Sequence, residues 1–317
     1  MSDEATTDDS GTWTIDEGHL LAARRAVDAH ALRTPVVSTP SLSLRLWLKL
    51  ESQQHTGSFK LRGALTRLAN LQPDELGRPL VVASAGNHGL GMAYAAKRLG
   101  MPLKVWVPSG VPEVKRAGIA ALGAEVMVCD DASYDGTERL ARADAEERGG
   151  LFVSPFDDPW VAAGNGGSLA EELFELASLS TLVVPVGGGG LLAGILAART
   201  RRGREDVRVV GVQSEACRAM AESLKQGAPI LEMHGDATLA EGLEGGVSAS
   251  TFRYAQQAAV PVELVTERAI AEAMRDTRTL GYRMEGSAAV SVAWAREHAA
   301  NEPGEGAVVA IVTGGNV

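Results

Sequence analysis

The segment Thr56-Gly57-Ser58-Phe59-Lys60 places a lysine directly after a flexible turn and an aromatic residue. Apolar neighbours keep water away from an ammonium group, and this desolvation disfavours the charged form and lowers its pKa. A neutral lysine amine is the nucleophile that Schiff-base chemistry needs. Most lysines that open an amphipathic helix are solvated surface residues. A catalytic role for Lys60 therefore depends on partners elsewhere in the chain.

Four consecutive glycines, Gly187, Gly188, Gly189 and Gly190, precede Leu191 between an expected strand and an expected helix. Glycines let the backbone approach an anion closely, and a helix N-terminus adds N–H groups and the positive end of its dipole. The run predicts a phosphate-binding loop, with an ordinary flexible turn as the alternative. It is neither a GxGxxG dinucleotide fingerprint nor a P-loop, because the glycines are consecutive and no GK[ST] follows.

A second loop, Ser84-Ala85-Gly86-Asn87-His88, also follows an expected strand and opens a helix. Its small residues expose backbone N–H groups, and Ser84 and Asn87 add polar side chains. Such a loop is suited to binding a carboxylate. His88 could act as a general base, but a single loop histidine more often forms structural hydrogen bonds. We assign His88 no catalytic role.

Thr313 follows the last expected strand, in the segment Thr313-Gly314-Gly315-Asn316. Ligands of open α/β sheets bind at the carboxyl ends of strands, so the Thr313 hydroxyl could meet a ring nitrogen. The alternative is an ordinary C-terminal turn. A Schiff-base lysine, a phosphate loop, a carboxylate-binding loop and a hydroxyl for a ring nitrogen together indicate pyridoxal phosphate holding an amino acid.

The elements that must position these residues alternate along the chain. Strands are expected at 80–84, 103–108, 125–129, 181–186, 207–212, 262–265 and 307–312, and helices at 92–100, 113–122, 134–148, 191–201, 216–225, 267–280 and 286–299. Alternation at this spacing predicts βαβ units and parallel sheets. The turn-rich run 154–159 is the expected crossing between two lobes. We predict two doubly wound α/β lobes.

Composition limits the possible partners. The 317 residues include 30 Lys and Arg against 40 Asp and Glu, a formal charge of −10 that argues against nucleic acid and anionic membranes. No apolar run reaches the length of a transmembrane helix. Cys129 and Cys217 form neither a disulfide framework nor a metal-binding spacing. The acidic, polar N-terminus is expected to be a disordered lead over residues 1–12. We expect a cytoplasmic protein in a reducing compartment.

The chain resembles the fold type II (tryptophan synthase β-like) group of pyridoxal-phosphate enzymes, and within it the threonine/serine dehydratases and their serine racemase relatives. The matching motifs, in family order, are TGSFKLRGA, SAGNHGLG, SPFDDP, GGGGL, TLAEGLEGG and TGGN. They cover nearly the whole chain. The resemblance implies a cofactor between two lobes: a large PLP-binding domain of residues 13–52 plus 153–317, and a small mobile domain of residues 53–152.

The resemblance also implies a role for each matched residue. Lys60 would carry the cofactor and remove the Cα proton, Phe59 would pack against the pyridine ring, and Asn87 would bind its 3′-oxygen. Gly187 to Leu191 would hold the phosphate, and Thr313 would face the ring nitrogen. The substrate carboxylate would bind to the loop Ser84, Ala85, Gly86, Asn87 and His88. A neutral hydroxyl at the ring nitrogen favours prompt loss of a β-substituent.

Ala85 distinguishes among the family's activities. Racemases of the group carry at this position a serine that acts as a second acid or base, and an alanine methyl cannot transfer a proton. We predict elimination of L-threonine and/or L-serine to a 2-oxo acid and ammonia. The alternatives are a dehydratase for another β-hydroxy amino acid, such as hydroxyaspartate or an ectoine-derived compound, an amino-acid racemase, and a non-catalytic ligand-binding relative. The resemblance implies a homodimer or homotetramer.

Two positions depart from the family pattern. Asn165 stands in Ala163-Gly164-Asn165-Gly166-Gly167 where relatives often have a glutamine in AGQGT, which would alter hydrogen bonding beside the site. Gln213 stands where several relatives place a glutamate metal ligand. A neutral amide is a poorer ligand for a hard divalent cation than a carboxylate, so no metal is predicted.

Overall fold

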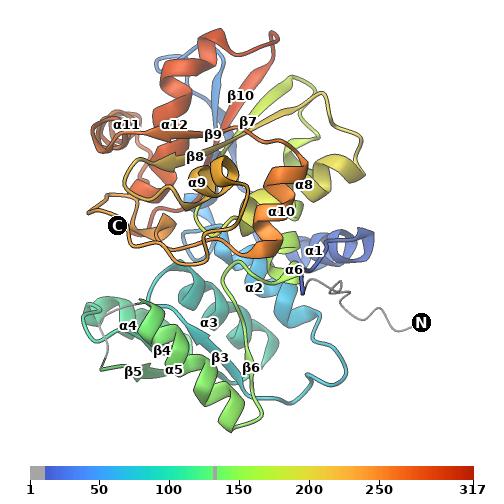
Figure 1. Cartoon of the computed structure of the whole chain (residues 1–317), viewed down its shortest axis with the longest axis vertical. Coiled ribbons are helices and arrows are strands. Elements are labelled where there is room, and N and C mark those ends of the chain that lie inside the picture. Colours follow the sequence, from blue (N-terminus) through green and yellow to red (C-terminus); the bar gives the residue numbers. More distant parts are fainter. Residues whose placement is uncertain (1–10, 131–133) are drawn as a thin grey trace.

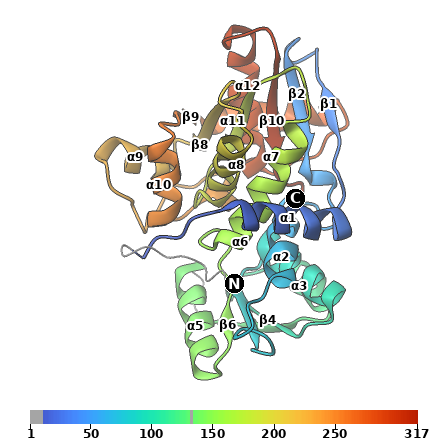
Figure 2. The ribbon, with the colours of Figure 1, turned by 90° about the vertical axis from the view of Figure 1, so that its right-hand side faces the viewer.

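The computed structural model describes residues 11–130 and 134–317. The expected disordered lead falls mainly on residues 1–10, outside the described residues, while Thr12 is buried. The chain forms two α/β lobes, and the helices α1 (Glu17–His30), α2 (Lys60–Ala69) and α6 (Pro159–Ala162) lie at the level where the lobes meet (Figure 1 and Figure 2). The C-terminus lies at the same level.

The large lobe contains a six-stranded sheet in the order β1-β2-β10-β7-β8-β9. Its strands are β1 (Val36–Ser38), β2 (Leu46–Leu50), β7 (Leu179–Pro185), β8 (Arg208–Ser214), β9 (Val262–Val265) and β10 (Ala307–Val312). All neighbouring pairs are parallel except β1 and β2. Every residue of β10 is buried, as expected for a continuous apolar strand covered on both faces.

Helices cover both faces of this sheet, and alternate residues of β10 separate the two cores. Val309 and Ile311 pack into one core and Val308 and Ala310 into the other, as the two-residue period of a strand requires. The helices of the large lobe beyond α1 and α6 are α7 (Ser168–Leu173), α8 (Gly190–Arg201), α9 (Ala219–Gln226), α10 (Ala249–Gln257), α11 (Glu267–Thr279) and α12 (Gly286–His298).

The small lobe is built on a parallel sheet in the order β5-β4-β3-β6. Its elements are β3 (Leu80–Ala83), β4 (Leu103–Val107), β5 (Glu125–Val128), β6 (Leu151–Phe152), α3 (Asn87–Leu99), α4 (Glu113–Ala120) and α5 (Tyr134–Glu147). Val82 and Val105 pack with Leu65 of α2 and Met92 of α3 in one core. The loop after β6, residues 154–158, then carries the chain back to the large lobe.

This arrangement confirms the predicted fold class of α/β lobes with mostly parallel sheets. Most predicted elements begin and end within a few residues of the observed ones, although α3 begins at Asn87 and not at Met92. Elements without a prediction include β1, β2, α1, α10 and the π-helical turn Ala163–Gly167 between α6 and α7. Within the described residues, no helix is long and apolar enough to cross a membrane.

Candidate active site

Lys60 is the first residue of α2, and its amine lies against the crossover loop 154–158. The Lys60 Nζ donates a hydrogen bond to the Pro155 carbonyl oxygen at 2.9 Å and lies 5.2 Å from the Phe59 ring centroid. Burial lowers the pKa of Lys60 to about 8, although the nearby Glu285 charge acts in the opposite direction. An amine with such a pKa is suited to nucleophilic and base chemistry near neutral pH.

A buried ion-pair network fixes the helix that carries Lys60. The Arg62 guanidinium, fully buried, binds Glu51 at 2.8 Å and Glu172 at 2.6 Å, and Lys49 binds Glu172 at 2.5 Å. Burial acts to lower the pKa of Arg62, but the charges and hydrogen bonds of Glu51 and Glu172 outweigh it and raise that pKa. Removing one member of such a network costs about 3–5 kcal/mol, because a buried charge is left unpaired. The first turn of α2 is therefore held firmly.

Asn165 adds a second anchor to the same helix. Its Oδ1 accepts a hydrogen bond from the Gly63 N–H at 2.8 Å. The residue that departs from the family's glutamine thus bonds directly to the helix of Lys60, and its side chain is buried.

The glycine run forms a tight loop at the N-terminus of α8. A Cβ on Gly190 would lie 2.7 Å from the Phe156 carbonyl oxygen, and one on Gly188 would lie 2.5 Å from the Phe156 ring. Gly189 has φ +89°, which favours glycine. The Thr251 hydroxyl of α10 donates to the Gly188 carbonyl oxygen at 2.8 Å. The loop is thus packed between the crossover loop and α10.

The loop Ser84–His88 of the small lobe follows β3 and leads into α3. Gly86 precedes α3, whose N-terminus has no side-chain cap, so its first N–H groups can bind an anion. The His88 ring is buried, and its Nε2 lies 3.2 Å from the Val153 carbonyl oxygen. Burial and the Lys60 charge lower the pKa of His88 to about 3, so the imidazole is neutral.

The end of β10 brings Thr313 to the lysine turn. The Phe59 N–H donates to the Thr313 carbonyl oxygen at 2.9 Å, and Ser58 pairs with Gly314 in an antiparallel bridge. Thr313 is itself buried. Direct contacts thus connect the Lys60 turn with the end of β10 and with the crossover loop, whose Phe156 packs on the glycine loop.

Glu285 and Asn316 join the site without having been predicted. The Asn316 Nδ2 donates to the Thr56 carbonyl oxygen at 2.9 Å and to the Asn87 Oδ1 at 2.6 Å, and the Asn87 Nδ2 donates to the Glu285 Oε1 at 2.8 Å. A backbone carbonyl can only accept, so Thr56 sets the orientation of both amides. One Asn87 amide hydrogen remains for a ligand.

No sequence signal singled out Glu285. It stands directly before α12, where a glutamate normally caps the helix or neutralises its dipole. Its side chain makes no capping bond and instead accepts the hydrogen bond from Asn87. Burial raises the pKa of Glu285, while the Asn87 hydrogen bond acts to lower it.

The residues present fit pyridoxal phosphate. The glycine loop leaves no room for side chains at Gly188 and Gly190, and its helix begins without a side-chain cap, as a phosphate site requires. Among the described residues, the Ser58 hydroxyl and the His88 Nδ1 are buried without a hydrogen-bond partner. Buried polar atoms near the lysine without protein partners are expected where a polar ligand binds.

Gln213 is already engaged by the protein. Its Nε2 donates to the Val186 carbonyl oxygen at 3.0 Å, and its Oε1 accepts from the Ala221 N–H at 2.9 Å. Residues 11–130 and 134–317 contain no group of three or more His, Cys, Asp or Glu side chains arranged to hold a metal. The Gln213 amide connects the strand end before the glycine loop to α9.

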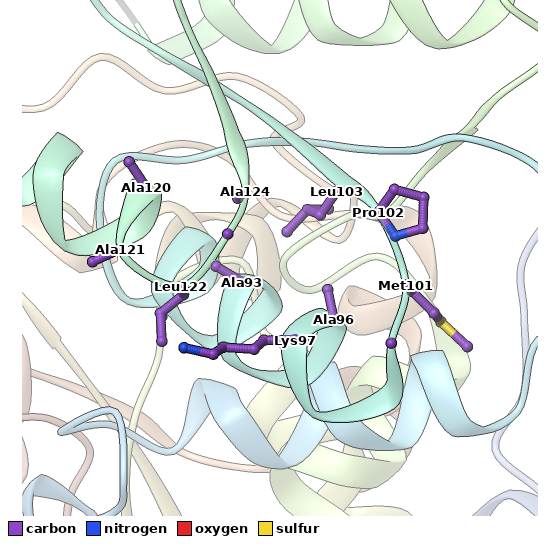
Figure 3. Close-up of a pocket in the computed structure, with 12 residues that line it drawn as sticks. Ala93, Ala96, Lys97, Met101, Pro102, Leu103, Ala120, Ala121, Leu122 and Ala124 are labelled. Carbon is purple, nitrogen blue, oxygen red and sulfur yellow. The ribbon is translucent and has the colours of Figure 1, made fainter.

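A separate hollow of about 550 Å³ opens in the small lobe where the C-terminal ends of α3 and α4 meet (Figure 3). Its lining is mostly alanine and other apolar residues, with Lys97 as a charged group. It includes Leu103, at the amino end of β4, whereas ligands of such sheets bind at the carboxyl ends. None of the predicted site residues lines this hollow.

The sequence model of the family described as "Pyridoxal-phosphate dependent enzyme" matches residues 27–314. The chain belongs to this family. A catabolic L-threonine dehydratase of Staphylococcus aureus (strain USA300) is 32% identical over 323 residues, covering 97% of this chain and 92% of that protein. An L-threonine ammonia-lyase of Geobacter sulfurreducens is 37% identical over 283 residues, covering 87% and 68% of the two chains.

Solved structures show the same likeness. A threonine deaminase from T.th. superposes with a TM-score of 0.86 at 34% identity, covering 95% of this chain and 98% of that one. Maize serine racemase superposes with a TM-score of 0.87 at 27% identity, covering 96% and 94%. Both a deaminase and a racemase share this fold, so the activity has to be argued from the site.

Proposed function

We propose that this protein eliminates the β-hydroxyl of an amino acid, L-threonine and/or L-serine, with pyridoxal phosphate, to give a 2-oxo acid and ammonia. The Lys60 amine carries this proposal, because its pKa is lowered to about 8 and it bonds to Pro155, next to the Phe156 that packs on the glycine loop. Relatives named L-threonine dehydratase and L-threonine ammonia-lyase support it.

Each predicted site residue has a place in the proposed complex. The loop Gly187–Gly190 and Leu191, at the start of α8, would hold the phosphate, Thr313 would face the ring nitrogen and Phe59 would pack on the ring. Asn87, with one amide hydrogen left over, would donate to the ring oxygen. The N-terminus of α3, with Ser84, Ala85, Gly86 and His88 around it, would bind the substrate carboxylate. Bound pyridoxal phosphate supplies the electron withdrawal that acidifies the α-proton of an amino acid.

Lys60 is the group that would move the protons. As a free amine its Nζ accepts the α-proton, and a pKa of about 8 makes this favourable near neutral pH. The Lys60 ammonium so formed can return a proton to the departing hydroxyl, which leaves as water. The released enamine then hydrolyses to the 2-oxo acid and ammonia. Fixing phosphate and carboxylate at two points positions the α-proton toward the amine.

Ala85 favours elimination over racemisation. Inverting an α-carbon needs a proton donor on the face opposite Lys60, and the Ala85 methyl provides none. The neutral His88 ring, turned to Val153, does not replace it. Measuring D-amino acid formation alongside 2-oxo acid separates the two activities.

A panel of β-hydroxy amino acids with detection of 2-oxo acid tests the proposal. L-threonine, L-serine, hydroxyaspartate and an ectoine-derived amino acid are compared, with Lys60→Ala as the control that removes the proton acceptor. We expect 2-oxo acid from threonine or serine with the wild type only. Absence of product from every member would overturn the proposal, and product from another member alone would reassign the substrate.

We further propose that residues 53–152 move as a small domain against 13–52 plus 153–317, and that the protein is a cytoplasmic homodimer or homotetramer with no nucleic-acid or membrane partner. The separate four-stranded sheet supports the moving small domain, and the negative net charge argues against nucleic-acid and anionic-membrane partners. Light scattering after size-exclusion chromatography would measure the oligomer. Scattering curves with and without a substrate analogue would measure domain closure.

A further inference from the structure

The glycine loop is held between two walls that belong to different parts of the chain. Phe156 of the crossover loop packs on Gly188 and Gly190, and Thr251 of α10 bonds to the Gly188 carbonyl oxygen. The spacing of the walls sets the shape of the loop, because a Cβ on Gly188 would already collide with Phe156.

Trp13 hydrogen-bonds to both the crossover loop and α10. Its Nε1 donates to the Asp157 Oδ1 at 2.7 Å, one residue beyond Phe156. Its backbone N–H donates to the Ser250 hydroxyl at 3.1 Å, one residue before Thr251, and Arg253 donates to its carbonyl oxygen at 2.8 Å. The indole is only 6% exposed. One residue thus bonds to the neighbours of both residues that shape the glycine loop.

The residues that Trp13 contacts are held in place by further interactions. The Asp157 N–H donates to the Ser154 hydroxyl at 3.0 Å, so the carboxylate that accepts from Trp13 sits on a fixed turn. The Trp13 ring lies 5.9 Å from the Tyr254 ring on α10, and the Tyr254 hydroxyl accepts from the Ile15 N–H at 2.6 Å. An indole N–H to a carboxylate is a charge-assisted bond, stronger than a neutral one.

We propose that Trp13 is a positioning residue of the cofactor site, which holds the crossover loop against α10 and so keeps the glycine loop in its phosphate-binding shape. This rests on the cofactor site of the proposed function. Trp13 touches neither Lys60 nor the loop Ser84–His88, so it acts on retention of the cofactor and not on proton transfer. Loosening it lets the walls separate and speeds cofactor release.

Trp13→Phe tests this, because it keeps most of the packing and removes only the N–H donor. Trp106→Phe is a matched control, since the Trp106 Nε1 donates to the Asp144 Oδ2 at 3.1 Å in the small lobe, away from the glycine loop. Holoenzyme is mixed with an excess of a second apoenzyme that traps free cofactor. The two proteins are separated at intervals, and loss of the visible band from the original holoenzyme gives the release rate.

We expect release to be about tenfold faster in Trp13→Phe, unchanged in Trp106→Phe, and accelerated to a smaller extent in Asp157→Asn, which keeps an acceptor oxygen but loses the charge. Turnover with saturating cofactor should change less than about twofold. Unchanged release in Trp13→Phe, or equal acceleration in Trp106→Phe, would overturn the proposal. The release rate needs no substrate, so this result is separate from the substrate panel.

Discussion

The glycine loop of the large lobe and the loop Ser84–His88 of the small lobe both lead into a helix N-terminus without a side-chain cap, yet they are packed differently. A Cβ on Gly190 would lie 2.7 Å from the Phe156 carbonyl oxygen, whereas a Cβ on Gly86 would meet nothing within 4 Å. The first loop is complete before any ligand arrives. The second leaves space beside the helix, as expected for a wall that adapts to a substrate.

Alanine substitutions at Gly190 and Gly86 should show the largest difference between the two loops. Gly190→Ala forces a methyl against backbone atoms, and overpacking of up to about 3 kcal/mol would weaken cofactor binding about 100-fold. Gly86→Ala enters open space and should leave cofactor affinity within about twofold. Titration of each apoenzyme with pyridoxal phosphate, followed by the bound-cofactor band, measures both. Equal losses at Gly190 and Gly86 would show that the loops do not differ in this way.

Asn316 joins the walls, and reversing its polarity tests that connection. In Asn316→Asp a carboxylate would face the Thr56 carbonyl and the Asn87 Oδ1. This repulsion should rotate the Asn87 amide by half a turn, so that its nitrogen no longer donates to the cofactor ring oxygen. We expect about tenfold weaker cofactor binding, equivalent to about 1.4 kcal/mol for one hydrogen bond. Val317→Ser, at an exposed neighbour, is the control.

Adding Glu285→Gln to Asn316→Asp sharpens the test. The glutamine nitrogen can donate to the turned Asn87 Oδ1, so thermal stability should rise above that of Asn316→Asp alone, while the repulsion between the introduced carboxylate and the Thr56 carbonyl remains. Cofactor affinity should stay low, because the Asn87 nitrogen then faces the carboxylate introduced at position 316 and not the ligand. Recovery of both quantities together would contradict the assigned amide orientation.

The sequence predicted the loops and the central strand better than the contacts between distant parts of the chain. Gly187–Gly190 and the apolar run of β10 carry their function in local composition, so the loop and the central strand were found directly. Glu285, Asn316 and Trp13 are ordinary residues in sequence, and their contacts lie 198, 229 and 144 positions away. Such pairings depend on how the lobes pack, which a single sequence does not encode locally.

Other elements were missed for local reasons. The strands β1 and β2 are short and joined by a turn-rich segment, so their antiparallel pairing has weak periodicity. The π-helical turn Ala163–Gly167 contains three glycines, which read as a loop by propensity. It is helical because α8 packs against it, a tertiary effect that overrides local preference.

The buried Lys60 side chain should destabilise the folded apoprotein. Its folded pKa of about 8 lies below the ordinary value of 10.5, so below pH 8 the folded protein must hold a charge in a buried place. Stability therefore rises as pH increases from about 8 to 10.5 and is constant below 8. Since the side chain keeps some solvent contact, Lys60→Met should stabilise the apoprotein at pH 7 by about 1–2 kcal/mol.

Urea unfolding of both apoproteins at pH 7 and pH 10 measures this. The advantage of Lys60→Met should shrink at pH 10, where the wild-type amine is already neutral in the folded state. Lys97→Met, at the hollow in the small lobe, controls for added hydrophobicity. An advantage that does not depend on pH would show that the Lys60 amine is not destabilised by burial.

The smallest expected effect concerns the open wall itself. Ala85→Ser would place a hydroxyl two residues before α3, whose N-terminus has no side-chain cap, and in the proposed complex this hydroxyl would be the second acid or base. A well-positioned acid or base contributes ~100-fold or more to a proton transfer, but in the described structure the neutral His88 ring is turned to Val153 and does not orient this hydroxyl. We therefore expect racemisation to rise only a few-fold above the wild-type background, with elimination nearly unchanged. Chiral analysis of recovered substrate in deuterated water measures it, with Ala85→Gly as the control without a hydroxyl. Substantial racemisation by the wild type would mean that the open wall already contains a second proton-transfer group.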